Sequence, residues 1–197
     1  MSARKILILN GHPGQTSLSK SLCAAYQSAA EGNGHLVRFH DISQMQFDMD
    51  YGQGGYHEPK PLEPDLAAFL GDLEWAEHVV MAAPLWWGAI PAKLKGVFDR
   101  ALLPGRAFDT RNANFLGLPA PMLTGKTARV LLTSDTPALL LRLFYGNAVK
   151  KFISRQILGF VGIKPTRFTT FAPATDAPES KVETWLAAAG GLGAKAA

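Results

Sequence analysis

A run of glycine and hydroxyl residues near the N-terminus has the composition of an anion-binding loop. Residues 10–19 read Asn-Gly-His-Pro-Gly-Gln-Thr-Ser-Leu-Ser, directly after an apolar run and before a predicted helix. Backbone N–H groups and the positive end of a helix dipole favour an anion at such a place. Thr16, Ser17, Ser19 and His12 would add side-chain donors. The same residues are compatible with a plain turn in which Ser17 only caps the helix, so both interpretations stay open.

Two common nucleotide-binding motifs are excluded by spacing. The dinucleotide pattern Gly-x-Gly-x-x-Gly would need a glycine where Pro13 stands. The segment Gly125-Lys126-Thr127 resembles the end of a P-loop, but Ala120 occupies the place of its leading glycine. That segment also precedes a predicted strand, whereas a P-loop follows one.

A second unusual loop carries two adjacent tryptophans. Trp86 and Trp87 stand between Pro84 and Pro91, which stiffen the loop, and Gly88 permits a close approach of backbone to a ligand. Two neighbouring tryptophans cannot both lie on one buried face of a regular element. They suit a flat aromatic ligand, or a subunit interface, where tryptophan is enriched. The two interpretations agree if the site lies at that interface.

Strands and helices alternate along the sequence in a way that places these two loops side by side. This alternation of strands and helices predicts an α/β protein with a five-stranded parallel sheet of order 2-1-3-4-5. Helices would cover both faces of the sheet, and residues 1–197 would form one domain. A ligand of this flavodoxin-like fold lies beyond the carboxyl ends of the first and third strands. The predicted strands are Lys5–Leu9, Leu36–His40, His78–Ala83, Arg129–Thr133 and Thr166–Phe171. The predicted helices are Ser17–Ala30, Glu63–Trp75, Ile90–Leu103, Leu139–Leu158 and Pro178–Ala189.

Composition narrows the class of protein. The 197 residues are 47% apolar and 18% charged, which is typical of a globular chain. A single cysteine, Cys23, and the absence of a long apolar stretch predict a cytoplasmic protein without a membrane span. The net charge of +4 is spread without long basic runs, so we expect no nucleic-acid partner. The five histidines lack metal-ligand spacing, so no metal site is expected.

Residues 84–100 resemble the signature of the NAD(P)H:quinone oxidoreductase family. They read Pro-Leu-Trp-Trp-Gly-Ala-Ile-Pro-Ala-Lys-Leu-Lys-Gly-Val-Phe-Asp-Arg. Gly11-His12-Pro13 and residues 16–19 resemble the phosphate loop of that family, and residues 104–108 resemble its next segment. The resemblance implies a bound flavin, FMN or alternatively FAD, reduced by NAD(P)H and reoxidised by a quinone or similar small acceptor. It also implies a homodimer.

The resemblance carries roles over to particular residues. His12, Ser17, Leu18 and Ser19 would surround the flavin phosphate. A second group would follow the edge and one side of the flavin ring: Pro84, Leu85, Trp86, Trp87, Gly88, Thr133, Ser134 and Asp135. Backbone N–H groups in the tryptophan loop would stabilise the negative charge of the reduced ring.

The fourth loop departs from the family pattern. Relatives carry Thr-Thr-Gly-Gly in this loop, whereas this chain has Ser134-Asp135-Thr136-Pro137 in place of the glycine pair. Tyr145 is within range of the ring, but no histidine follows His78. The Tyr/His pair credited with relaying charge in relatives therefore cannot be carried over, and the catalytic residues stay unassigned. A flavodoxin-type electron carrier and a flavin-binding accessory subunit remain alternatives. The apolar segment 138–145 could be a dimer contact, a substrate roof or helix core, and the loop Tyr51–Pro61 could reach a neighbouring subunit.

Overall fold

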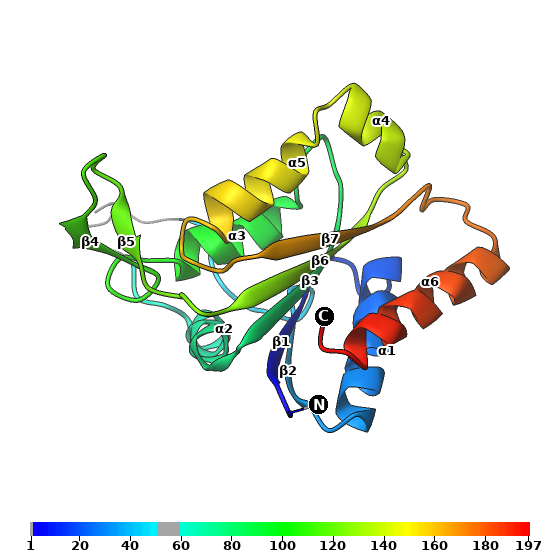
Figure 1. Ribbon diagram of the computed structural model, residues 1–197, viewed down its shortest axis with the longest axis horizontal. Helices are drawn as coiled ribbons and strands as arrows, with labels where there is room; N and C mark the ends of the chain where they lie inside the picture. The colour runs from blue at the N-terminus through cyan, green and yellow to red at the C-terminus, as the bar shows by residue number, and fades with distance from the viewer. Residues whose placement is uncertain (1, 51–59) are drawn as a thin grey trace.

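The computed structural model describes residues 2–50 and 60–197, and it has a parallel five-stranded sheet at its centre. The order of the strands is β2-β1-β3-β6-β7, with every neighbouring pair parallel (Figure 1). This confirms the predicted 2-1-3-4-5 order, with β6 and β7 as the fourth and fifth strands. The strands are β1 (Lys5–Asn10), β2 (Leu36–Asp41), β3 (His78–Pro84), β6 (Thr127–Thr133) and β7 (Thr166–Phe171).

Helices cover both faces of the sheet, which explains why its central strands are apolar without alternation. Successive side chains of a strand point to opposite faces: Leu7 and Leu9 pack in one core, whereas Ile6 and Ile8 pack in the other. The first core is completed by α2 (Pro64–Trp75), α3 (Ala92–Ala101) and α5 (Ala148–Lys151). The second is completed by α1 (Leu18–Gly32) and α6 (Glu179–Gly193), which pack against each other (Figure 1).

The single helix predicted over Leu139–Leu158 is wrong. The chain there forms α4 (Ala138–Leu143), then α5, then the π-helix η1 (Phe152–Ile157). The break falls at Gly146 and Asn147, which have φ values of 56° and 55°. Glycine and asparagine are the residues that adopt this left-handed conformation most readily. The local backbone preference of this pair therefore overrides the helical spacing of the leucines around it.

A two-stranded antiparallel sheet was not predicted. It consists of β4 (Phe108–Ala113) and β5 (Pro119–Pro121), and it extends away from the main sheet (Figure 1). Phe115 and Leu116, between the two strands, are exposed. Polar residues and prolines dominate these strands, so they lack the aliphatic alternation that reveals a strand in sequence.

In the described part of the chain, no helix is long and apolar enough to cross a membrane. Most of the loop Tyr51–Pro61, which was expected to reach a neighbouring subunit, lies outside the described residues.

Candidate functional site

The loop between β1 and α1 presents donors to solvent at the start of the helix. Ser17 caps α1: its Oγ accepts from the backbone N–H of Lys20 at 3.1 Å, and its own proton remains free to donate. The Nδ1 atom of His12 accepts from the N–H of Gly14 at 2.9 Å, which places the proton of the neutral ring on Nε2. The first N–H groups of α1 have no intrahelical acceptor. Capping and anion binding are therefore compatible in the same residues.

A buried polar network holds this loop in place. The fully buried Asn10 donates from Nδ2 to Asp41 Oδ1 at 2.9 Å, and its Oδ1 accepts from the N–H of His12 at 3.2 Å. Asp41 in turn pairs with Lys20 of α1 at 2.9 Å. Burial raises the pKa of Asp41, but hydrogen bonds from Lys20, Ser43 and Asn10 more than offset it and lower the pKa below its usual value. The carboxylate therefore links β1, β2 and α1 around the loop.

Gly11 lets the loop pass close to β3 and α3. Its N–H donates to the carbonyl of Ala82 at 2.7 Å. A Cβ atom at this position would lie 2.6 Å from Leu94 Cδ2 and 2.9 Å from the Ala82 carbonyl oxygen, both closer than atoms tolerate. This glycine is therefore required by packing and not by a positive φ.

The tryptophan loop is a two-residue turn. Trp86 and Ala89 exchange both backbone hydrogen bonds at 2.9 Å, and the residues between them have positive φ, 51° at Trp87 and 77° at Gly88. Positive φ at both central positions defines a type I′ turn, in which a bulky residue such as Trp87 is strained. The Trp87 side chain is fully exposed, and the Trp86 ring stands edge-on to His12 with ring centroids 5.4 Å apart. The two tryptophans thus share no buried face, as predicted.

Within the described residues, the backbone N–H groups of Trp87 and Gly88 donate to no protein acceptor. They are available to a ligand beside the turn. Leu85, just before the turn, is instead anchored to β6, because its N–H donates to the Thr133 carbonyl at 2.8 Å.

The end of β6 closes the site between the other two loops. The Thr133 hydroxyl lies 3.5 Å from that of Ser19, so the first and fourth loops touch. Asp135 accepts from the N–H of Thr175 at 2.6 Å and from its hydroxyl at 2.9 Å. The Thr175 hydrogen bonds lower the pKa of Asp135, so it is ionised at neutral pH. An anionic group therefore stands at the rim of the site.

Two adjoining cavities collect all the predicted site residues. The smaller, about 240 Å³, and the larger, about 510 Å³, share Leu85, Ser134 and Asp135. The smaller is also lined by His12, Thr16, Ser17, Leu18, Ser19, Pro84, Trp86, Thr133, Ala174 and Thr175. The larger is also lined by Trp87, Gly88, Thr136, Leu141, Tyr145, Asn147, Ala148 and Val149.

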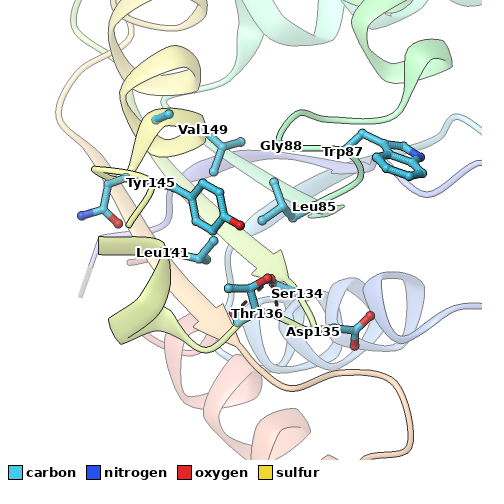
Figure 2. Close-up of a pocket in the computed structure, with 11 residues that line it drawn as sticks. Leu85, Trp87, Gly88, Ser134, Asp135, Thr136, Leu141, Tyr145 and Val149 are labelled. Atoms are coloured by element: carbon cyan, nitrogen blue, oxygen red, sulfur yellow. Dashed lines mark hydrogen bonds between the residues drawn. The ribbon is translucent and has the colours of Figure 1, made fainter. Parts of the chain in front are cut away.

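The larger cavity has apolar walls and one tyrosine. Figure 2 shows Leu85, Leu141 and Val149 around it, with the Tyr145 hydroxyl directed between Leu85 and Ser134. The Trp87 ring is turned away from Tyr145, at the opposite edge. Most of the Tyr145 side chain is exposed.

Sequence reasoning missed part of this lining. Ala174 and Thr175 follow β7, whose carboxyl end lies beside that of β6. The predicted strand order could therefore have placed these two residues at the site. Asn147, Ala148 and Val149 were placed inside a continuous helix and not beside the site. Cys23 is fully buried, and burial raises the pKa of its thiol to about 12, which does not suit a nucleophile. No cluster of metal-ligating side chains occurs among the residues that the structure describes.

A ligand cavity beyond the carboxyl ends of β1, β3 and β6 lies where the strand order reverses, which is the binding position of doubly wound α/β proteins. Fold and site therefore place the chain among the doubly wound α/β proteins. More narrowly, the chain belongs to the family of the flavodoxin-like fold, whose sequence pattern matches residues 4–190.

Named relatives agree with the resemblance to NAD(P)H:quinone oxidoreductases. The chain is 28% identical over 192 residues to FMN-dependent NADH:quinone oxidoreductase 1 of Xanthomonas axonopodis pv. citri, covering 91% of this chain and 90% of the relative. It is 30% identical over 127 residues to NAD(P)H dehydrogenase [quinone] 1 of Rattus norvegicus, covering 55% and 46%.

The chain spans between 46% and 66% of the length of several of the curated relatives that it matches. Among solved structures, the NAD(P)H:quinone oxidoreductase of Methanothermobacter marburgensis superposes with a TM-score of 0.80 at 24% identity, covering 99% of this chain and 96% of that one. At this identity the superposition shows the fold alone.

Proposed function

We propose that the protein is a flavin-dependent NAD(P)H oxidoreductase that passes two electrons to a quinone or similar small electrophilic acceptor. One observation carries the proposal: a cavity rich in hydrogen-bond donors adjoins an apolar cavity at the strand switch point. The donor-rich cavity suits a phosphate group, and the apolar cavity suits flat rings. The names of the relatives support the same reaction class.

The residues of the smaller cavity fit the phosphate of FMN. Its donors are the N-terminus of α1, the hydroxyls of Thr16, Ser17 and Ser19, and Nε2 of His12. Lys20, whose charge is paired with Asp41, does not line it. We prefer FMN to FAD because the sequence has no recognisable motif for an adenosine end and because one relative is named FMN-dependent.

The chain would bind the flavin ring through backbone groups as well as through side chains. The free N–H groups of Trp87 and Gly88 lie where donors can stabilise negative charge on a reduced ring. When bound, the flavin would supply the chemistry of taking a hydride from NAD(P)H and passing on two electrons. Asp135 at the rim would disfavour acceptors that carry a negative charge. An uncharged quinone suits this electrostatic setting.

The larger cavity is open enough to take the nicotinamide and the acceptor in turn. Apolar walls and the Tyr145 hydroxyl would orient either ring, and shared use of one cavity would give ping-pong kinetics. We keep the homodimer as part of the proposal. Trp87 and the exposed α4 residues Leu139 and Leu143 offer apolar surface beside the cavity, as does Phe144 at the end of that helix. The location we expect is the cytoplasm.

The test is cofactor identification on purified protein. The protein should release FMN on denaturation, or quench FMN fluorescence at micromolar concentration more strongly than it quenches FAD fluorescence. With FMN bound, it should oxidise NADH or NADPH rapidly only when a quinone is present, and sediment as a species of twice 21.2 kDa. Failure to quench either flavin would overturn the proposal. Flavin binding with slow NAD(P)H oxidation would favour an electron carrier, and co-purification with a membrane protein would favour an accessory subunit.

A further inference from the structure

A second group of polar side chains lies away from the candidate flavin site and includes two arginines in register. Arg129 of β6 and Arg167 of β7 are direct partners on neighbouring parallel strands, so their side chains share one face of the sheet. Like charges placed opposite each other destabilise a sheet. Burial and the charge of Arg167 both lower the pKa of Arg129, which is only 8% exposed. Among the described residues, its side chain makes one hydrogen bond, from Nη1 to the neutral hydroxyl of Thr169 at 3.2 Å.

Arg4, just before β1, adds a further cation to this group, and the first residue of β3, His78, adds a polar side chain. The Thr127 hydroxyl accepts from Arg4 Nη2 at 3.2 Å and lies 2.6 Å from His78 Nδ1. The other His78 nitrogen, Nε2, is buried without a hydrogen-bond partner. Burial and the charges of Arg4, Arg129 and Arg167 lower the pKa of His78 to about 3, so the ring is neutral. A buried polar atom without a partner costs free energy unless a ligand or water satisfies it.

No ion pair is formed by these cations with the described residues. Within residues 2–50 and 60–197, no carboxylate oxygen lies within 4.0 Å of a nitrogen of Arg4, Arg129, Arg167 or Lys195. The ion pairs of the described residues all use other cations. A cluster of cations without ion-pair partners is unfavourable by itself and attracts an anion.

A cavity of about 180 Å³ opens at this cluster. Arg4, His78, Thr127, Arg167 and Lys195 line it, together with the last residues of the chain. Arg4 Nη1 donates to the carbonyl of Ala196 at 2.9 Å, which fixes the segment after α6 beside β1. The C-terminal segment accordingly lies on the side of the sheet covered by α1 and α6 (Figure 1). Arg167 and Lys195 are exposed and form the outer part of the site, whereas His78 lies at its buried end.

We propose that this cavity binds a phosphate group. Its donors come from separate elements, namely Arg4 before β1, His78 of β3, Arg167 of β7 and Lys195 after α6. Donors from separate elements suit the tetrahedral oxygens of a phosphate better than the planar oxygens of a carboxylate. Guanidinium groups bind phosphate oxygens in pairs, and the surplus of positive charge suits a divalent anion. The cavity holds a phosphate group with room for water. The group could be inorganic phosphate or the phosphate of a small monoester such as a nucleoside monophosphate.

The experiment is calorimetric titration of the purified full-length protein with inorganic phosphate and, separately, with AMP, at constant ionic strength set by chloride. We expect saturable one-site binding of at least one of them, and a phosphate-dependent rise in Tm beyond that given by chloride. Arg167→Gln and Lys195→Gln should each weaken the affinity by about tenfold or more, the scale of a hydrogen bond to a charged group. The ¹⁵N resonance of His78 Nε2 should shift on saturation in the wild type.

The matched control is Arg155→Gln, an exposed arginine of η1 on the opposite face of the sheet. It should leave phosphate affinity and Tm response unchanged, and none of the three variants should alter FMN affinity. Binding of phosphate alone identifies the free anion as the ligand, whereas binding of AMP alone identifies a monoester. Failure of both ligands to bind at millimolar concentration, or equal weakening in Arg155→Gln, would overturn the site.

Discussion

The β1–α1 loop and the tryptophan turn both border the candidate flavin site, but they are held in place very differently. The loop is tied to its surroundings through Asn10, Asp41 and Gly11, which connect it to β2, β3 and α1. The turn has only the two hydrogen bonds between Trp86 and Ala89 at its tip, and its most prominent side chain is fully exposed and strained.

This difference indicates a division of labour within one site. A preorganised polar loop loses little conformational entropy when a phosphate binds, so it is suited to holding the cofactor tightly in either redox state. A strained and exposed turn is suited to contacts that change with the ligand beside it. Mutations on the two sides should therefore affect affinity and reactivity separately.

The largest expected effect is on the loop. The double variant His12→Ala, Ser17→Ala removes two donors, each worth about 1.5–3 kcal/mol when bonded to a charged group. Flavin affinity should fall by one to a few orders of magnitude with little change in redox potential, because phosphate contacts are the same in both redox states. Fluorescence titration measures the first and equilibrium redox titration the second. Ser21→Ala, an exposed hydroxyl one turn further along α1, should change neither. Wild-type affinity in the double variant would mean that the phosphate binds elsewhere.

An intermediate effect is expected at Gly11. Gly11→Ala forces a Cβ atom against the Ala82 carbonyl and Leu94, and overpacking of this kind costs about 1–3 kcal/mol of unfolding free energy. Since the loop must shift to relieve the clash, flavin affinity should fall as well. Urea denaturation and flavin titration measure the two quantities. Gly32→Ala, at the end of α1 with open space around it, should be neutral or slightly stabilising. An unchanged flavin affinity in a destabilised Gly11→Ala protein would show that the loop need not be preorganised.

The smallest effect on stability should come from the turn. Asparagine tolerates a positive φ better than tryptophan does, so Trp87→Asn should leave stability unchanged or raise it by up to about 1 kcal/mol. Flavin affinity should change little, whereas the flavin absorption band and the rate of reduction by NAD(P)H should shift. Stopped-flow reduction tests this, with Phe115→Asn as the control for loss of an exposed aromatic ring. An unaltered spectrum and rate would mean that Trp87 has no contact with the ring.

The site was predictable from sequence where chain order alone determines position. The carboxyl ends of β1, β3 and β6 must meet in a sheet of this order, so the sequence is enough to place His12, Trp86 and Ser134 together. The polar network that supports these residues was not predictable. Nothing in the sequence marks Asp41, at the end of β2, as a partner of Asn10, because the sheet alone brings the two together. The same holds for Arg129 and Arg167, whose opposition depends on register. Asn147 escaped prediction for a local reason, since its left-handed backbone interrupts an otherwise helical pattern.

The left-handed break at Gly146 and Asn147 has a consequence for the walls of the two cavities. It separates α4, which buries only Leu141, from α5 and η1, which are anchored in the core through Val149 and Ile153. Substitutions at the exposed leucines of α4 therefore cost little stability, and no α4 residue lines the donor-rich cavity of the β1–α1 loop. Of the α4 residues, only Leu141 lines the larger cavity. That wall can therefore shift with one short helix, while the residues proposed to hold the flavin phosphate keep their places in the β1–α1 loop.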